Sequence, residues 1–429
     1  MRDVIFMGFL SLCLAFAVRY PFTALLTWAW FTLATPQMAA YYAQSLPLNL
    51  LIAAVTFVAL FMHSEYKRFR FDTITVLMLL FAFWLIVSQN QSLDPEYSAE
   101  PFDRFLKIMI FILLCAQLVT DRLRFHALLW VVIIIMGFYG AKGGAYTILT
   151  LGRNNYFGLE NTILFDNNHM GVALATVLPL FLYIHGQVAS KWVRHGIKAV
   201  FLLSIIAILG TFSRGALVAL IVFAGFMWLR SSKRLLYLGL VVAMMIPAAL
   251  LLPDRWFDRM ETIGTATQDD SFMGRVDAWV INYKLAREHP LTGVGMRNSY
   301  QEPIARQVDM KRTPRAAHSI YFEILGGMGF VGLFIYLGIL GVAFLKAASA
   351  YTRYRYAKFG HWRSSFGYHA QISLVVFGVG GASISMEMWE GYLIIIALIA
   401  SLKRIEPETV RSVDNRVTLR IREKVEKAV

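Results

Sequence analysis

Arginine and histidine residues are the first candidates for chemistry in this chain. Arg214 stands in the sequence Thr-Phe-Ser-Arg-Gly, between two apolar segments. Its planar guanidinium offers five N–H donors in a fork that suits phosphate oxygens. The same side chain could instead extend to ordinary lipid headgroups. The adjacent Gly215, which permits close approach to the backbone, slightly favours a binding site.

Arg275 lies in Gly-Arg-Val-Asp-Ala-Trp, at the expected beginning of a helix. Apolar residues recur at roughly helical spacing between residues 273 and 289, and Pro290 ends the pattern. Free N–H groups at a helix N-terminus favour anions such as phosphate. The alternative is a salt bridge from Arg275 to Asp277 or Asp270 on a solvated surface.

His318 marks the point where a polar stretch meets a long apolar segment. A histidine between water and membrane can act as a general base near neutral pH. The alternative is a neighbour of a helix N-cap that bonds to the backbone. Glu323 follows inside the apolar segment, where a carboxylate is costly and usually has a partner, so we interpret it as structural. The same segment contains four glycines that would allow close helix packing, namely Gly326, Gly327, Gly329 and Gly332.

The elements that must position these residues are apolar helices. Hydrophobic residues make up 58% of the 429 residues and charged residues 16%, whereas an average soluble domain is under half apolar and about a quarter charged. This composition excludes a soluble globular enzyme, a disordered chain and a disulfide scaffold. A helix needs about 20 apolar residues to cross the bilayer core. We predict an all-α polytopic integral membrane protein with about twelve or thirteen transmembrane helices, near residues 4–18, 22–35, 46–62, 73–88, 104–119, 125–140, 169–185, 196–212, 215–229, 235–252, 318–345, 367–386 and 388–402.

The net charge of +14 indicates the orientation of the chain in the membrane and not nucleic-acid binding. Basic residues gather in alternate loops and in the C-terminal tail, which the positive-inside rule assigns to the cytoplasm. The remaining loops, including 141–168, then lie outside. We expect helices in 1–252, one large outer loop containing helices in 253–317, further helices in 318–402 and a basic cytoplasmic tail in 403–429.

Cofactor motifs are not evident. Cys13 and Cys115 both lie in apolar segments, so neither a disulfide nor a cysteine metal site is expected. The sequence has no Walker-type phosphate loop and no His-Glu-x-x-His. The adjacent pair Asp269 and Asp270 is weak evidence for a cation. We therefore expect neither a metal nor another cofactor.

Three elements nevertheless occur in a recognisable order. Ser213-Arg214-Gly215 occupies a short outer turn, Gly274-Arg275 opens a helix that contains Trp279, and His318 enters a Gly-rich span. With the many-helix topology and one large outer loop, the chain resembles the O-antigen ligase family of bacterial envelopes. The resemblance covers most of residues 140–345. The segment His-Pro-Leu-Thr-Gly-Val-Gly, residues 289–295, is also similar to a loop of that family.

The resemblance implies a glycosyltransferase-C-like membrane fold in the bacterial inner membrane, with the active site facing the periplasm. It implies an undecaprenyl-pyrophosphate-linked glycan as donor, a sugar hydroxyl of the lipid A-core as acceptor, and neither metal nor nucleotide. By position, Arg214 and Arg275 would hold the pyrophosphate and His318 would be the base. Direct displacement would invert the anomeric centre.

Other functions remain open at this point. An O-antigen polymerase uses the same donor but a second lipid-linked glycan as acceptor. Related ligases that glycosylate proteins usually have a longer C-terminal region than this tail. A flippase or transporter of polyprenyl-linked glycans would also contain many helices, but such proteins commonly have matched halves, and the large loop here occurs once.

Overall fold

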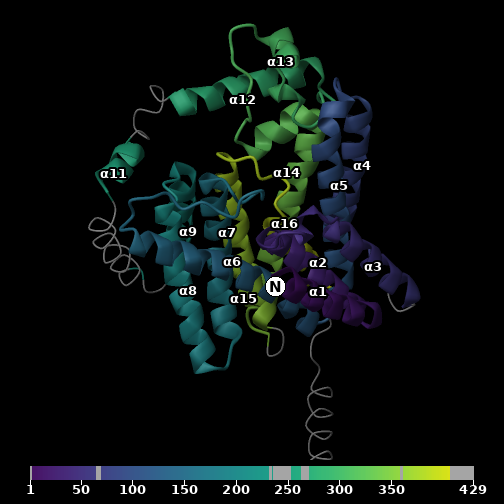
Figure 1. The fold of residues 1–429 in the computed structure, drawn as a ribbon, viewed down its shortest axis with the longest axis vertical. Coiled ribbons are helices and arrows are strands. Elements are labelled where there is room, and N and C mark those ends of the chain that lie inside the picture. Colours follow the sequence, from purple (N-terminus) through teal and green to yellow (C-terminus); the bar gives the residue numbers. More distant parts are fainter. Residues whose placement is uncertain are drawn as a thin grey trace, which may run out of the picture.

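The protein is all-helical throughout the described part of the chain, which comprises residues 2–63, 69–230, 234, 253–261, 270–357 and 361–405 of the computed structural model (Figure 1). The predicted span 235–252, Asp269 and most of the predicted tail 403–429 lie outside these residues. The helices are α1 (Arg2–Arg19), α2 (Pro21–Ala34), α3 (Leu48–Met62), α4 (Thr73–Asn90), α5 (Pro95–Leu118), α6 (Arg122–Leu149), α7 (Asn167–Gln187), α8 (Lys191–Gly210), α9 (Arg214–Arg230), α11 (Asp254–Glu261), α12 (Asp270–Glu288), α13 (Glu302–Val308), α14 (Ile320–Tyr354), α15 (His361–Gly381) and α16 (Glu390–Ser401).

The described helices are consistent with a protein that crosses a membrane several times. Five of them, α4, α6, α7, α8 and α14, are long and apolar enough to cross a bilayer, and α2, α3 and α16 are shorter apolar helices. The predicted number of about twelve or thirteen spans is not confirmed. In α16 all 12 residues are buried, and a helix of this length covers only about 18 Å. Its hydrophobicity therefore fits a core helix surrounded by protein.

Aspartates determine where several helices begin. Asp72, Asp94, Asp121 and Asp166 occupy the N-cap positions of α4, α5, α6 and α7, and each carboxylate accepts a hydrogen bond from a main-chain N–H of the first turn. Such caps satisfy donors that the helix itself leaves unpaired, and their negative charge suits the positive end of the helix dipole.

The central helices are α7, α15 and α16, in which most residues are buried. Helix α15 packs against α7, α9 and α14, while α6 packs along α8. The predicted outer loop 141–168 is shorter than expected because α6 continues to Leu149. Gly144 explains the extension, since a Cβ there would clash with the main chain at Leu203 of α8. Glycine in α6 thus serves close helix packing rather than a loop.

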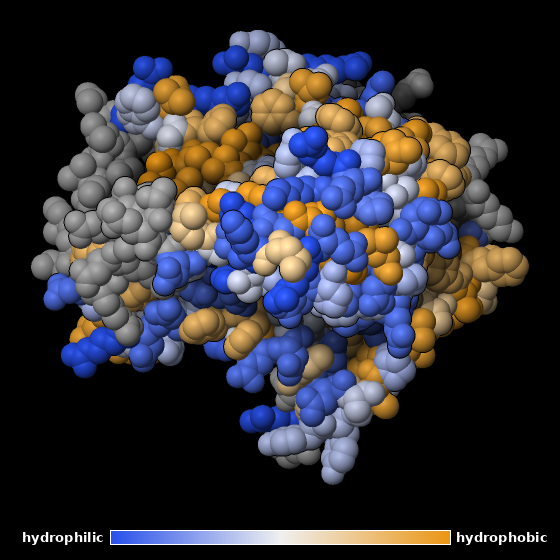
Figure 2. Space-filling view, turned by 90° about the horizontal axis from the view of Figure 1, so that it is seen from above, coloured by the Kyte–Doolittle hydropathy of each residue, from blue (hydrophilic) through white to orange (hydrophobic). Residues whose placement is uncertain are grey.

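Helices α12 and α13 form a cap at one end of the molecule, above the membrane helices (Figure 1). The cap has a small core of its own, made by Ile281, Leu285, Val294, Ile304 and Ala305. Seen from this end, hydrophilic residues cover the middle and lower parts of the view, and hydrophobic residues lie mainly in its upper and right-hand parts (Figure 2). Two ion pairs, Lys284–Asp309 and Arg312–Asp277, join α12 to the segment that leads to α14.

The glycines of α14 allow close packing, as expected, but three of the four face the cap: Gly326 meets Asn282 of α12, Gly327 and Gly329 meet the loop after α12, and Gly332 lies near Trp84 of α4. Gly329 has a φ of 68° and interrupts the helical geometry of α14. The main chain of loop 290–295 docks at this break: Val294 N–H donates to the Gly326 carbonyl at 3.0 Å, and Phe330 N–H donates to the Pro290 carbonyl at 2.9 Å. Only residues without side chains permit such close backbone approach.

Candidate functional site

Arg214 is the first residue of α9 and follows the tight turn 211–213 after α8. The turn is short, as expected, and Phe212 within it has a φ of 56°. Ser213 caps the new helix because its hydroxyl accepts a hydrogen bond from Ala216 N–H at 3.1 Å. The Arg214 side chain is half-buried. Its position at the beginning of α9 therefore follows from a built turn rather than from a free loop.

Arg275 does not open its helix. Helix α12 begins at Asp270, so Arg275 lies in its second turn and the unpaired N–H groups of the N-terminus lie a turn away. An anion held by Arg275 would therefore meet the guanidinium and not the helix end. Asp277, the alternative partner considered from the sequence, forms an ion pair with Arg312.

The turn between α15 and α16 brings the two arginine segments together. Nη1 of Arg275 donates to the Ser383 carbonyl at 3.4 Å. Gly215 packs so closely on Ser383 that a Cβ at Gly215 would clash with the serine hydroxyl. The residue after Arg214 and the side chain of Arg275 therefore contact the same serine. Ser383 lies 108 positions from Arg275, and no pattern in the sequence indicated it.

His318 is held in place through its neighbours. The residue before it, Ala317, uses its carbonyl to accept a hydrogen bond from Trp279 Nε1 at 2.7 Å. Trp279 in turn stacks on Phe322, with ring centroids 5.4 Å apart. The residue after it, Ser319, is the N-cap of α14. His318 itself has a φ of 46°, a left-handed conformation that is uncommon outside glycine and is found at functional sites.

Glu323 organises the base of the site. Its Oε1 accepts three hydrogen bonds, from Tyr300 Oη at 2.6 Å, from Ser385 Oγ at 2.7 Å and from Ala317 N–H at 2.9 Å. These donors come from the cap, the α15–α16 turn and the segment before His318. Burial raises the pKa of Tyr300 well above its usual value, so this phenol remains a donor. Glu323 has the partners that a buried carboxylate requires, in agreement with its structural interpretation.

Electrostatics keep His318 neutral. Partial burial of the imidazole and the nearby positive charge of Arg275 lower the pKa of His318 to about 4. Near neutral pH the side chain therefore lacks its second proton and can accept one. Arg275 is therefore one of the charged groups that determine how readily His318 takes up a proton.

His169 is a further residue of this cluster, and the sequence alone did not indicate it. It lies in the first turn of α7, and its Nδ1 is 2.7 Å from the carbonyl of Ile163. Because a carbonyl only accepts, Nδ1 must carry the proton. Nε2 is buried and has no hydrogen-bond partner among the described residues. The charges of His169 and Asp166 both influence the pKa of His318.

The structure thus brings the Arg275 side chain and Gly215, the residue after Arg214, together on Ser383, and the charge of Arg275 lowers the pKa of His318. Together these features define a multi-pass, all-helical membrane protein with a basic site where the cap meets the helices. Residues 199–337 match the model of the O-antigen ligase family, which confirms the resemblance inferred from the sequence. Residues 1–188 match a family of unknown function (DUF5935). No curated protein matches the chain.

The matched range contains Arg214, Arg275, His318 and Glu323. It supports a membrane protein of the O-antigen ligase or polymerase type, with glycosyltransferase-like activity. Ser383, Ser385 and His169 lie outside this range. The site therefore combines residues from the family segment with a residue of α7 before it and residues of the α15–α16 turn after it.

Proposed function

We propose that the protein transfers an O-antigen glycan from undecaprenyl pyrophosphate to a sugar hydroxyl of the lipid A-core. The observation that carries this proposal is the meeting of the Arg214 and Arg275 segments on Ser383, together with the influence of the Arg275 charge on the pKa of His318. A pyrophosphate requires several N–H donors, and an acceptor hydroxyl requires a base. Both are present at one end of the membrane helices.

The arginines would act on the leaving group. Negative charge grows on the pyrophosphate as its bond to the anomeric carbon breaks. Arginine forks that are already oriented stabilise this charge without reorganisation, and half-buried surroundings strengthen the effect. In this proposal Arg214 and Arg275 bind the pyrophosphate, and the reaction proceeds without metal, as the family resemblance implies.

His318 would act on the acceptor. Its neutral imidazole takes the proton of the acceptor hydroxyl as the oxygen attacks the anomeric carbon from the face opposite the pyrophosphate. A new glycosidic bond forms, the bond to the pyrophosphate breaks, and undecaprenyl pyrophosphate leaves with the electron pair. The anomeric configuration is inverted. The negative donor would raise the pKa of His318 towards neutrality, which improves it as a base.

His169 would orient the bound glycan. Its Nε2 can accept a hydrogen bond but has no partner among the described residues, and its influence on the pKa of His318 indicates proximity. We propose that Nε2 accepts a hydrogen bond from a hydroxyl of the bound glycan. In this arrangement His318 removes a proton and His169 only orients a substrate.

We also propose that the site lies on the periplasmic side of the membrane. The positive-inside rule assigns the cap formed from 253–317 to the periplasm, and hence the site to the outer face of the inner membrane. A glycosyltransferase-C-like arrangement of the helices belongs to the same proposal. The candidate residues gather at one end of the helices, which favours a transferase over a flippase, since a transporter needs groups that serve both sides.

The test is a transfer assay with purified protein and a polyprenyl-pyrophosphate-linked glycan. Lipid A-core, a second lipid-linked glycan and an acceptor protein are supplied separately, and products are separated by mass. We expect a product with lipid A-core only. A product with the second lipid-linked glycan would identify a polymerase instead, and glycosylated protein would identify a protein ligase.

A further inference from the structure

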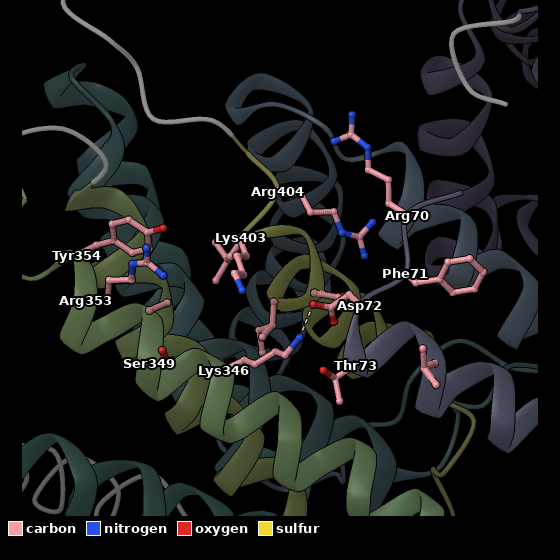
Figure 3. A pocket seen from close by; sticks show the side chains of 15 residues that line it. Arg70, Phe71, Asp72, Thr73, Lys346, Ser349, Arg353, Tyr354, Lys403 and Arg404 are labelled. Atoms are coloured by element: carbon pink, nitrogen blue, oxygen red, sulfur yellow. Dashed lines mark hydrogen bonds and ion pairs between the residues drawn. The ribbon is translucent and has the colours of Figure 1, made fainter. Parts of the chain in front are cut away.

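A second basic site lies at the opposite end of the membrane helices from the cap. A cavity of about 940 Å³ opens between the beginning of α4, the last turns of α14 and the end of α16. Its lining includes five cationic side chains and one carboxylate, namely Arg70, Lys346, Arg353, Lys403, Arg404 and Asp72 (Figure 3). The volume is in the range of pockets that bind whole small molecules.

The carboxylate is already engaged within the protein. Asp72 caps α4 by accepting a hydrogen bond from Ile74 N–H at 2.9 Å, and it forms an ion pair with Lys346. Among the described residues no carboxylate is paired with Arg353 or Lys403, both of which are exposed. The cavity therefore carries an excess of positive charge that its own acid does not balance.

Arg404 adds a partly buried cation. Its guanidinium donates to neutral oxygens, to the Ala116 carbonyl at 3.0 Å and to Thr75 Oγ1 at 3.1 Å. Its Nε is buried without a partner in the described structure. In Figure 3 this guanidinium extends toward Asp72, with Lys403 beside it and Arg353 on the facing helix. Cations thus line more than one wall of the cavity.

The position of the cavity indicates what fills it. Helices α4 and α14 are candidate membrane spans, and the cavity lies at the ends of both, where lipid headgroups are found. Apolar residues line part of it, including Val76, Ile399 and Leu402. By the positive-inside rule this is the cytoplasmic side, and basic pockets between helix ends on that side suit anionic headgroups.

We propose that this cavity binds the phosphate of an anionic phospholipid from the cytoplasmic leaflet. Arg353, Lys403 and Arg404 contact the phosphate, and the apolar lining holds the adjoining part of the acyl chains. The site is separate from the proposed glycan-transfer site, which lies at the other end of α14, and it does not depend on that function.

The experiment measures binding of fluorescent phosphatidylglycerol to the purified full-length protein in detergent. Unlabelled phosphatidylglycerol, phosphatidylcholine and inorganic phosphate serve as competitors. The test variant is the double substitution Arg353→Gln with Lys403→Gln, which leaves the structural hydrogen bonds of Arg404 intact. The control is Lys191→Gln with Lys198→Gln, which removes the same charge from exposed positions of α8.

We expect phosphatidylglycerol to compete much better than phosphatidylcholine, and the test variant to bind it about tenfold more weakly. The control variant should bind as the unmodified protein does. Equal binding by the test variant, or no preference for the anionic lipid, would overturn the proposal. Displacement by inorganic phosphate as effective as by phosphatidylglycerol would identify a soluble phosphate as the ligand and overturn the lipid assignment.

Discussion

The Oε1 atom of Glu323 lies 2.9 Å from the main-chain nitrogen of Ala317, the residue immediately before His318. This contact joins the first turn of α14 to the segment that contains His318, the candidate base. The same oxygen accepts hydrogen bonds from Tyr300 and Ser385. One buried carboxylate thus aligns the cap, the α15–α16 turn and the approach to His318.

Replacement of Glu323 by alanine should remove the hydrogen bonds that hold the cap, the α15–α16 turn and the segment before His318 together. Glu323→Ala leaves one buried and two half-buried donors without an acceptor, and we expect a loss of about 2 kcal/mol or more in the free energy of unfolding. Glu323→Gln keeps an acceptor oxygen and should retain most of the stability and transfer activity. Thermal unfolding and transfer rates of both variants test this relationship. Stability and transfer by Glu323→Ala equal to those of the unmodified protein would show that the carboxylate does not organise the site.

Substitution of His318 should remove the base without unfolding the protein. We expect His318→Ala to insert and fold normally but to lose at least about a hundredfold in transfer rate. The control is His289→Ala, which removes another histidine from the cap side. A transfer assay on both variants decides the point, and near-normal transfer by His318→Ala would exclude it as the base.

Arg214 should require its fork and not only its charge. Arg214→Lys keeps the positive charge but cannot make two parallel hydrogen bonds to a phosphate. We expect a severe loss of transfer, with a higher KM for the lipid-linked donor. Arg230→Lys, at the other end of α9, is the matched control and should leave KM unchanged. If both variants behave alike, the bidentate contact is wrong.

The pH dependence should report the influence of the Arg275 charge on His318. The pKa of His318 is about 4, so its neutral form persists well below pH 6 in the free enzyme. The positive charge of Arg275 helps to hold this pKa down. Arg275→Gln should raise the pKa, so the acidic limb of kcat/KM should move to higher pH. A limb that stays in place would contradict the proposed base or its partner.

Gly329 should be necessary for docking of the cap. Its φ of 68° and its contacts with the carbonyls of Leu291 and Pro290 leave no room for a side chain. We expect Gly329→Ala to destabilise the protein by about 2 kcal/mol. Gly338→Ala in the same helix meets no atom within 4 Å and should be neutral or slightly stabilising. Relative to the unmodified protein, the unfolding temperature should fall clearly for Gly329→Ala and should stay the same or rise slightly for Gly338→Ala.

Several helices could be predicted because hydropathy is a local property. The expected spans near 73–88 and 169–185 correspond to α4 and α7, within a few residues. The number of spans could not be predicted in the same way. An apolar helix such as α16 has the same composition whether lipid or protein surrounds it, and only packing distinguishes the two cases.

By itself the sequence determined that the protein is apolar and helical, that its basic residues gather in alternate loops, and that Arg214, Arg275 and His318 are chemically suited to phosphate and proton transfer. These properties depend on residue types and short-range order. Only the tertiary structure decided that Ser383 connects the arginine segments, that Glu323 supports the approach to His318 and that His169 lies nearby. Except for the local bond between Glu323 and Ala317, these contacts join residues far apart in the chain, and the packing of helices and turns creates them.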